Sequence, residues 1–87
     1  MTKEIYNLGN YGEIKLNLQN LLNDRGINRN TLATYAQVSP NMVSRYCKNN
    51  IIRVDLDILA RFCKILECDI TDILIYETSA ETEGNEE

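Results

Sequence analysis

The stretch TLATYAQVSPNMVSRYCKNN, residues 31–50, decides the fold of this 87-residue chain. Within it, Ser39 is a preferred helix N-cap, and Pro40 suits a first helical position because its missing N–H costs nothing there. Asn49 can end such a helix because Asn tolerates the left-handed backbone conformation. The pattern predicts a short helix over about residues 40–48.

A second short helix precedes it, over about residues 29–36, with Asn28 as its N-cap. Ala33 is a small residue inside this helix, and it lets another helix cross closely. Val38 supplies an apolar residue in a tight turn, and Val43 is placed to lock the following helix onto this one. The spacing is that of a helix-turn-helix.

The predicted helix at 40–48 has two chemically different faces. One face is apolar and is expected to pack inward; it holds Val43, Tyr46 and Cys47. The other face is polar to basic at helical spacing; it holds Asn41, Ser44, Arg45 and Lys48. The second face is therefore expected to be exposed.

Three further segments carry helical patterns. Residues 13–26 place apolar side chains at helical spacing and end at Gly26, a residue that suits a helix C-terminus. Their expected inward residues are Ile14, Leu18, Leu21 and Leu22. Residues 54–67 carry the next helical pattern, with Asp55 as the cap and with Leu56, Leu59, Phe62, Cys63 and Leu66 inward. Residues 70–76 follow Asp69. The sequence predicts a compact, all-α domain of five helices.

Charge is unevenly distributed along the chain. Residues 25–54 contain five basic side chains and no acidic one, whereas residues 77–87 contain five glutamates and no base. The formal net charge of −4 therefore reflects the last segment, since the remaining chain sums to 9 − 8 = +1. We expect residues 1–12 to form an N-terminal arm and residues 77–87 to form a disordered acidic tail.

Composition argues against several classes of protein. The chain has no histidine, no Gly-rich phosphate loop and no metal-ligand spacing, and the acid pair Asp55 and Asp57 begins a helix, where carboxylates serve as caps. We expect no catalysis, cofactor, metal or small-molecule substrate. The three cysteines are odd in number and match no metal or redox motif, and no apolar run could span a membrane. These features favour a cytoplasmic protein.

Residues 13–76 resemble the phage-repressor (Cro and CI) type of helix-turn-helix transcriptional regulator. The resemblance rests on TLATYAQVSPNMVSRYCKNN followed at the expected distance by VDLDILARFCKILECDITDIL. The chain departs from the family pattern where Gly is usual, at Gln37 in the turn and at Glu67 after the fourth helix. It also has Cys47, Lys48 and Asn49 where the family usually has Glu-Asn-Gly.

The resemblance implies a lambda-repressor-like domain that is encoded by a bacterium or a phage and binds double-stranded DNA as a homodimer. The expected base contacts are Pro40, Asn41, Met42, Ser44 and Arg45. The chemistry of this face agrees, because Arg can pair with guanine and Asn with adenine. The expected phosphate contacts are Asn28, Arg29, Thr31, Lys48, Asn49, Asn50 and Arg53. The expected dimer contacts are Ile73, Ile75 and Tyr76, with Ile5, Tyr6 and Leu8 of the arm as further candidates.

A repressor is the expected function, and a protein-binding module is the alternative. In the alternative, the helix-turn-helix face or the acidic tail would bind another protein, as in an antirepressor or an inhibitor that mimics nucleic acid. A mimic should carry acids on its binding surface, whereas residues 25–54 are free of them. The charge pattern therefore favours DNA.

Overall fold

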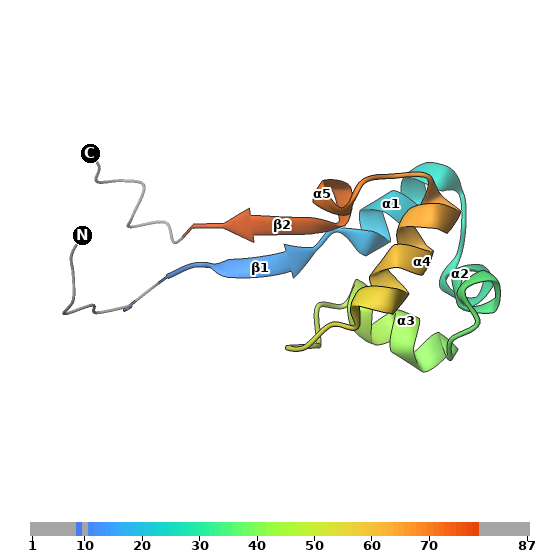
Figure 1. The fold of residues 1–87 in the computed structure, drawn as a ribbon, viewed down its shortest axis with the longest axis horizontal. Helices are drawn as coiled ribbons and strands as arrows, with labels where there is room; N and C mark the ends of the chain where they lie inside the picture. The colour runs from blue at the N-terminus through green and yellow to red at the C-terminus, as the bar shows by residue number, and fades with distance from the viewer. Residues whose placement is uncertain (1–8, 10, 79–87) are drawn as a thin grey trace.

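The computed structural model describes Gly9 and residues 11–78. Its elements run in this order: β1 (Glu13–Leu16), α1 (Leu18–Arg25), α2 (Arg29–Ala36), α3 (Pro40–Cys47), α4 (Leu56–Leu66), α5 (Ile70–Ile73) and β2 (Leu74–Glu77). The helices pack into one body, and the two strands form a ribbon that extends away from it (Figure 1).

Helices α2, α3 and α4 begin at the capping residues that the sequence predicted. The Asn28 side chain accepts a hydrogen bond from the Thr31 N–H at 2.8 Å, and the Ser39 hydroxyl accepts one from the Met42 N–H at 3.1 Å. Asp55 caps α4 by accepting the Asp57 N–H at 2.9 Å. These bonds satisfy backbone donors that have no partner within the helix.

Helices α1 to α4 are each followed, at the C-cap or one residue later, by a residue in the left-handed conformation. Gly26 closes α1 with φ 67°, as the sequence predicted. After α2, α3 and α4 a residue with a side chain adopts this conformation: Gln37 at φ 61°, Asn49 at φ 60° and Glu67 at φ 52°. Helix α5 instead runs into β2 at Leu74, which is extended. Gln37 and Glu67 are positions where the family usually has Gly.

The core lies between α1, α2, α3 and α4. Its buried residues are Leu16, Leu18, Leu21, Leu22, Leu32, Ala33, Ala36, Val43, Tyr46, Cys47, Ile58, Leu59, Phe62, Leu66 and Ile73. The Tyr46 and Phe62 rings meet edge to face, with centroids 5.6 Å apart. The Tyr46 hydroxyl accepts the Asp55 N–H at 3.0 Å, so the ring fastens α3 to the start of α4.

The all-α prediction is wrong at both ends of the domain, because the mostly helical fold also contains a two-stranded antiparallel sheet. Residues 13–16 form β1 instead of the first turn of a helix, and Ile14 is 60% exposed rather than inward. Helix α5 ends at Ile73, and the chain continues as β2. One more inward assignment fails in α4, where Leu56 is exposed, whereas Cys63 is partly buried and packs against the core.

The register of the ribbon pairs Ile14 with Tyr76 and Leu16 with Leu74. Leu16 is buried, so the apolar side of the ribbon continues from the core outward to Ile14 and Tyr76. Gly12 precedes β1 with φ 84°, and a Cβ there would collide with the Glu77 carbonyl oxygen. Residues of the predicted arm and tail that fall at 1–8, 10 and 79–87 lie outside the described residues.

Glu77 belongs to the ribbon rather than to the tail. Its carboxylate lies 3.2 Å from the Lys15 ammonium, which also contacts Glu13 at 3.2 Å. These contacts raise the pKa of Lys15, mainly through its hydrogen bonds to Glu13 and Glu77. The charged side of the ribbon is therefore opposite to its apolar side. Across residues 9 and 11–78, every helix is too short or too polar to span a bilayer.

Candidate nucleic-acid interface

Helix α3 divides its side chains as the sequence predicted. Val43, Tyr46 and Cys47 are buried against the core. Asn41 and Arg45 are exposed, as is Lys48 at the C-terminal end, while Met42 and Ser44 are partly exposed beside them. Pro40 is exposed at the first helical position. The helix thus presents amide, guanidinium, ammonium and hydroxyl groups on one continuous outer face.

The basic residues fall into two structural groups. Arg25 donates to the Leu66 carbonyl at 2.8 Å, and Arg61 donates to the Ala36 carbonyl at 2.9 Å, so both serve the ends of neighbouring helices. By contrast, among the described residues no ion pair involves Arg45, Lys48 or Arg53. The three cations at and after α3 are therefore available to an outside anion.

The loop after α3 forms a shallow depression next to the helix. Its lining combines basic, amide and apolar side chains: Arg45, Asn50, Ile51, Ile52 and Arg53. Ile52 is 98% exposed, so it contributes little to the core. Arg45 of the helix and Arg53 of the loop thus border the same surface. Both side chains can therefore approach the phosphates of a DNA backbone that lies against it.

Arg29 occupies a different setting from these exposed cations. It is partly buried at the start of α2, where its Nε donates to the Gln19 Oε1 at 2.7 Å and its Nη1 donates to the Ser44 Oγ at 3.0 Å. The residue therefore links α1, α2 and α3. Gln19 was missed at the sequence level, because a partner ten residues away on another helix leaves no local pattern.

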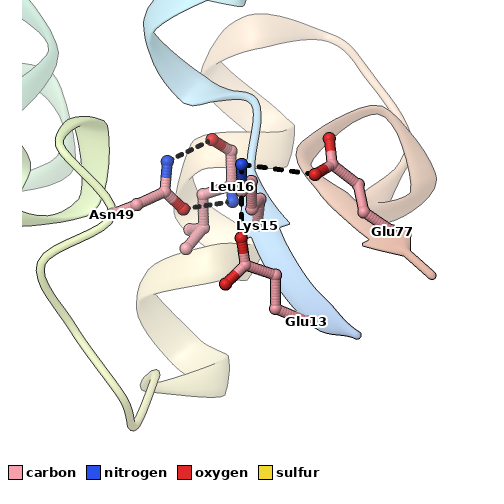
Figure 2. Close-up of polar contacts among 5 residues, drawn as sticks. All are labelled: Glu13, Lys15, Leu16, Asn49 and Glu77. Carbon is pink, nitrogen blue, oxygen red and sulfur yellow. Dashed lines mark hydrogen bonds and ion pairs between the residues drawn. The ribbon is translucent and has the colours of Figure 1, made fainter. Parts of the chain in front are cut away.

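The Asn49 side chain is committed to the fold (Figure 2). Its Oδ1 accepts the Leu16 N–H at 2.6 Å, and its Nδ2 donates to the Leu16 carbonyl at 3.1 Å. We call this pair of bonds the Asn49 clamp. It ties the end of α3 to strand β1, so the amide that was predicted to contact phosphate is already paired within the chain.

The expected phosphate contacts at the start of α2 are also partly engaged. Asn28 uses its side-chain oxygen as the helix cap, and Thr31 uses its backbone N–H in the same bond. Asn28 remains exposed and Thr31 partly exposed, so the Asn28 amide nitrogen and the Thr31 hydroxyl stay near the surface.

The expected dimer residues separate in the structure. Ile73 is fully buried in the core, so it has no surface to offer to a second copy, and that assignment is wrong. Ile75 and Tyr76 lie on β2 and are 38% and 57% exposed. Ile14, which was expected in the core, joins them on the ribbon.

Two other features of the described residues concern metal ligands and the Cys47 thiol. Among residues 9 and 11–78, no group of three or more His, Cys, Asp or Glu side chains could hold a metal ion. Burial raises the pKa of the Cys47 thiol, and the Arg29 guanidinium beside it acts in the opposite direction. The site therefore offers hydrogen-bond donors and positive charge.

Comparison with known proteins agrees with this geometry. The chain belongs to the Cro/C1-type helix-turn-helix DNA-binding domain family, whose family model matches residues 17–79. It is thus a Cro/CI-type helix-turn-helix regulator by family. No curated protein sequence matches it.

Two solved structures show the same fold. A candidate DNA-binding protein from Bacteroides fragilis is 22% identical, with a TM-score of 0.66 over 72% of this chain and 100% of the other. The transcriptional regulator VanUg is 25% identical, with a TM-score of 0.65 over 91% of this chain and 100% of the other.

Proposed function

We propose that this chain is a sequence-specific transcriptional repressor that binds double-stranded DNA as a homodimer. The observation that carries the proposal is the outer face of α3, where Asn41, Arg45 and Lys48 are exposed on a helix whose other face is buried. An α-helix fits the major groove of B-DNA, where each base pair shows a distinct pattern of donors and acceptors. Repression needs only occupancy of a promoter, which a domain of this size can supply.

The base contacts follow from the chemistry of each side chain. Arg45 can donate two hydrogen bonds to guanine, and Asn41 can both donate to and accept from adenine. Pro40 and Met42 offer apolar contact to thymine methyl groups. Ser44 lies between these residues on the outer face and adds a hydroxyl.

The phosphate contacts are the remaining exposed groups around α3. Lys48 and Arg53 carry free positive charge, and Asn50 lies in the same surface depression as Arg53. Asn28 and Thr31 flank the N-terminus of α2, where backbone N–H groups favour anions. These contacts would fix the register of the domain on DNA without reading sequence.

The ribbon is the proposed dimer contact. Its apolar side carries Ile14 opposite Tyr76, which are 60% and 57% exposed, and Ile75 is 38% exposed on the other side. A two-stranded ribbon is marginally stable alone, so contact with the ribbon of a second copy would stabilise it. A two-fold dimer would also place two copies of α3 on half-sites about 34 Å apart.

Selection of bound duplexes from a random DNA pool, followed by competition with single-base variants, tests this function. Arg45→Ala should lose about 1 to 3 kcal/mol on the selected site and relax preference at one position in each half-site. Asn41→Ala should do the same at a neighbouring position. Arg53→Ala is the comparator, because loss of a phosphate contact should weaken all duplexes about equally and reduce the salt slope by about 1. Uniform losses for Arg45→Ala and Asn41→Ala would contradict sequence reading by α3.

A protein partner is the second candidate, and one observation favours it. Ile52 and Leu56 are 98% and 78% exposed in and just after the loop that follows α3. Ile52 lines the same depression as Arg45 and Arg53, and an exposed apolar residue among basic side chains suits a mixed protein interface. In that case Ile52→Ser would abolish capture of the partner and leave DNA binding unchanged.

A further inference from the structure

The bond between Arg29 and Ser44 determines how the Ser44 hydroxyl can be used. A guanidinium group has hydrogen-bond donors and no acceptor, so the Ser44 Oγ must accept in the 3.0 Å bond from Arg29 Nη1. The single hydroxyl proton of Ser44 is then directed away from Arg29. Ser44 is partly exposed on α3, between Asn41 and Arg45.

Thr34, another hydroxyl residue in the two central helices, behaves differently. Thr34 of α2 donates its proton to the Asn30 carbonyl one turn earlier, at 3.0 Å. This is the usual local partner for a hydroxyl inside a helix. Within residues 9 and 11–78, no hydrogen bond uses the proton of Ser44, so this proton remains available to an outside acceptor.

The orientation of Arg29 is itself fixed by a chain of bonds. Gln19 donates its Nε2 to the Asn23 Oδ1 at 2.9 Å, which turns its Oε1 towards Arg29. Arg29 Nε then donates to that oxygen at 2.7 Å. The Arg29 guanidinium group is therefore held in place by bonds within the chain. Its positive charge lies beside the Ser44 hydroxyl.

We propose that Ser44 binds DNA as a hydrogen-bond donor, and that Arg29 is a positioning residue that sets this polarity. One of the two lone pairs of the Ser44 Oγ accepts from Arg29, and the adjacent positive charge disfavours a second donor at the other. The inference rests on the proposed reading of DNA by α3. The ligand atom is an acceptor: a purine N7, guanine O6, thymine O4 or a phosphate oxygen. Cytosine N4 and adenine N6 carry donors, so Ser44 discriminates against them at its position. Arg29 thus acts on specificity through Ser44, rather than as a phosphate contact.

Duplexes that lack one acceptor at a time test the role of Ser44. The duplex is the one selected by the whole chain. Base acceptors are removed with 7-deazapurines, 2-aminopurine or 5-methyl-2-pyrimidinone, and phosphate charge is removed with methylphosphonates. The wild-type chain should lose affinity about tenfold at the position that Ser44 contacts, whereas Ser44→Ala should show no further loss there. A response in the base series identifies a base edge, and one in the methylphosphonate series identifies a phosphate oxygen.

Two outcomes separate this inference from the function on which it rests. If the wild-type chain binds all duplexes equally, the proposed function and this inference both fail. If the wild-type chain selects a sequence, but Ser44→Ala responds to every modified duplex as the wild type does, only this inference is overturned.

Two variants, Arg29→Gln and Arg29→Lys, test whether Arg29 is what makes Ser44 a hydrogen-bond donor. The Gln carbonyl can accept a proton from Ser44, so Arg29→Gln should relax base preference at that one position. Lys can only donate, so Arg29→Lys should keep the preference even if it lowers stability. Arg53→Gln is the matched control, because it removes the same charge from a residue without a bond to Ser44, and it should weaken all duplexes alike. When the acceptor is a base edge, equal Arg29→Gln losses on all duplexes, or loss of the preference in Arg29→Lys, would overturn the positioning role. When the acceptor is a phosphate oxygen, a methylphosphonate loss in Arg29→Gln equal to that of the wild type would overturn it.

Discussion

Gln37 is a long side chain at a backbone position that suits glycine. Its φ of 61° closes α2, and its side chain is exposed. The left-handed conformation costs a residue with a Cβ about 1 kcal/mol, and glycine avoids most of that cost. Gln37→Gly should therefore raise the free energy of unfolding by about 0.5 to 1 kcal/mol, measured by urea denaturation.

Thr34→Gly is the matched control for this prediction. Thr34 is also exposed in α2, but it lies inside the helix, where glycine should lower the free energy of unfolding by about 0.5 kcal/mol. If Gln37→Gly lowers stability as Thr34→Gly does, strain at Gln37 is not the governing effect.

The Cys47 thiol should make the free energy of unfolding depend on pH in the alkaline range. Burial raises the pKa of its thiol above the ordinary value of 9.0, against the smaller opposite effect of Arg29. The neutral thiol is therefore favoured in the folded state. Its contribution to stability is fully present below the unfolded pKa and is lost as pH rises through the folded pKa.

Unfolding in urea from about pH 7 to about pH 10 should show a declining free energy at the upper end of the range. Cys47→Ala should be less stable at neutral pH, because it leaves space in the core, but its decline with pH should be shallower. Equal declines in both proteins would show that Cys47 does not contribute to the alkaline loss.

Single residues also show what the sequence could predict. Asn28, Ser39 and Asp55 are recognisable as caps, because a cap bonds to a backbone group two or three residues away. The outer face of α3 follows from the spacing within one helix. The bond between Arg29 and Gln19 and the Asn49 clamp were not predictable from the sequence. Their partners lie 10 and 33 positions apart in the chain, so they leave no local pattern.

Among the elements, β1 and β2 are where the sequence was read wrongly. Residues 13–18 alternate polar and apolar side chains, which is a strand pattern, but Ile14, Leu18 and Leu21 also match helical spacing. Residues 73–76 are all apolar, so they show neither the strand period nor the helix period. Pairing of the two segments decides between helix and strand. This pairing joins residues that are far apart in the chain, such as Ile14 and Tyr76, so no local pattern reveals it.

The Asn49 clamp should stabilise the junction between α3 and β1. Asn49→Ala should lower the free energy of unfolding by about 1 to 3 kcal/mol, because it leaves the Leu16 N–H and carbonyl without partners. The Leu16 amide proton, which should exchange slowly with solvent in the wild type, should exchange faster in the variant. Hydrogen exchange followed by NMR measures this effect directly.

Asn49→Gly separates the clamp from the backbone conformation. Glycine relieves any strain at φ 60° but lacks the amide. If the clamp matters, Asn49→Gly should still be less stable than the wild type and should lose protection at Leu16. A variant as stable and as protected as the wild type would contradict this account.

For the whole molecule, the oligomeric state is the decisive measurement. Sedimentation at tens of micromolar should show a dimer, and Ile14→Lys should shift it to a monomer by placing charge on the apolar side of the ribbon. Leu56→Lys is the control, since it alters another exposed apolar residue that belongs to α4 and not to the ribbon, and it should leave the dimer intact. A wild-type chain that stays monomeric, both free and on DNA, would contradict the ribbon as a dimer contact.

The ribbon also has a consequence for how the protein is made. Strand β1 pairs only with β2 in the described sheet, and every helix lies between them in the chain. A ribosome therefore completes α2 and α3 before β1 has its partner, and this pairing must close a long loop. An unfinished chain can possess the recognition helix while it still lacks the surface proposed for dimerisation. Only a chain that extends through β2 could then compete for a paired operator, so synthesis itself would keep shorter chains from occupying it.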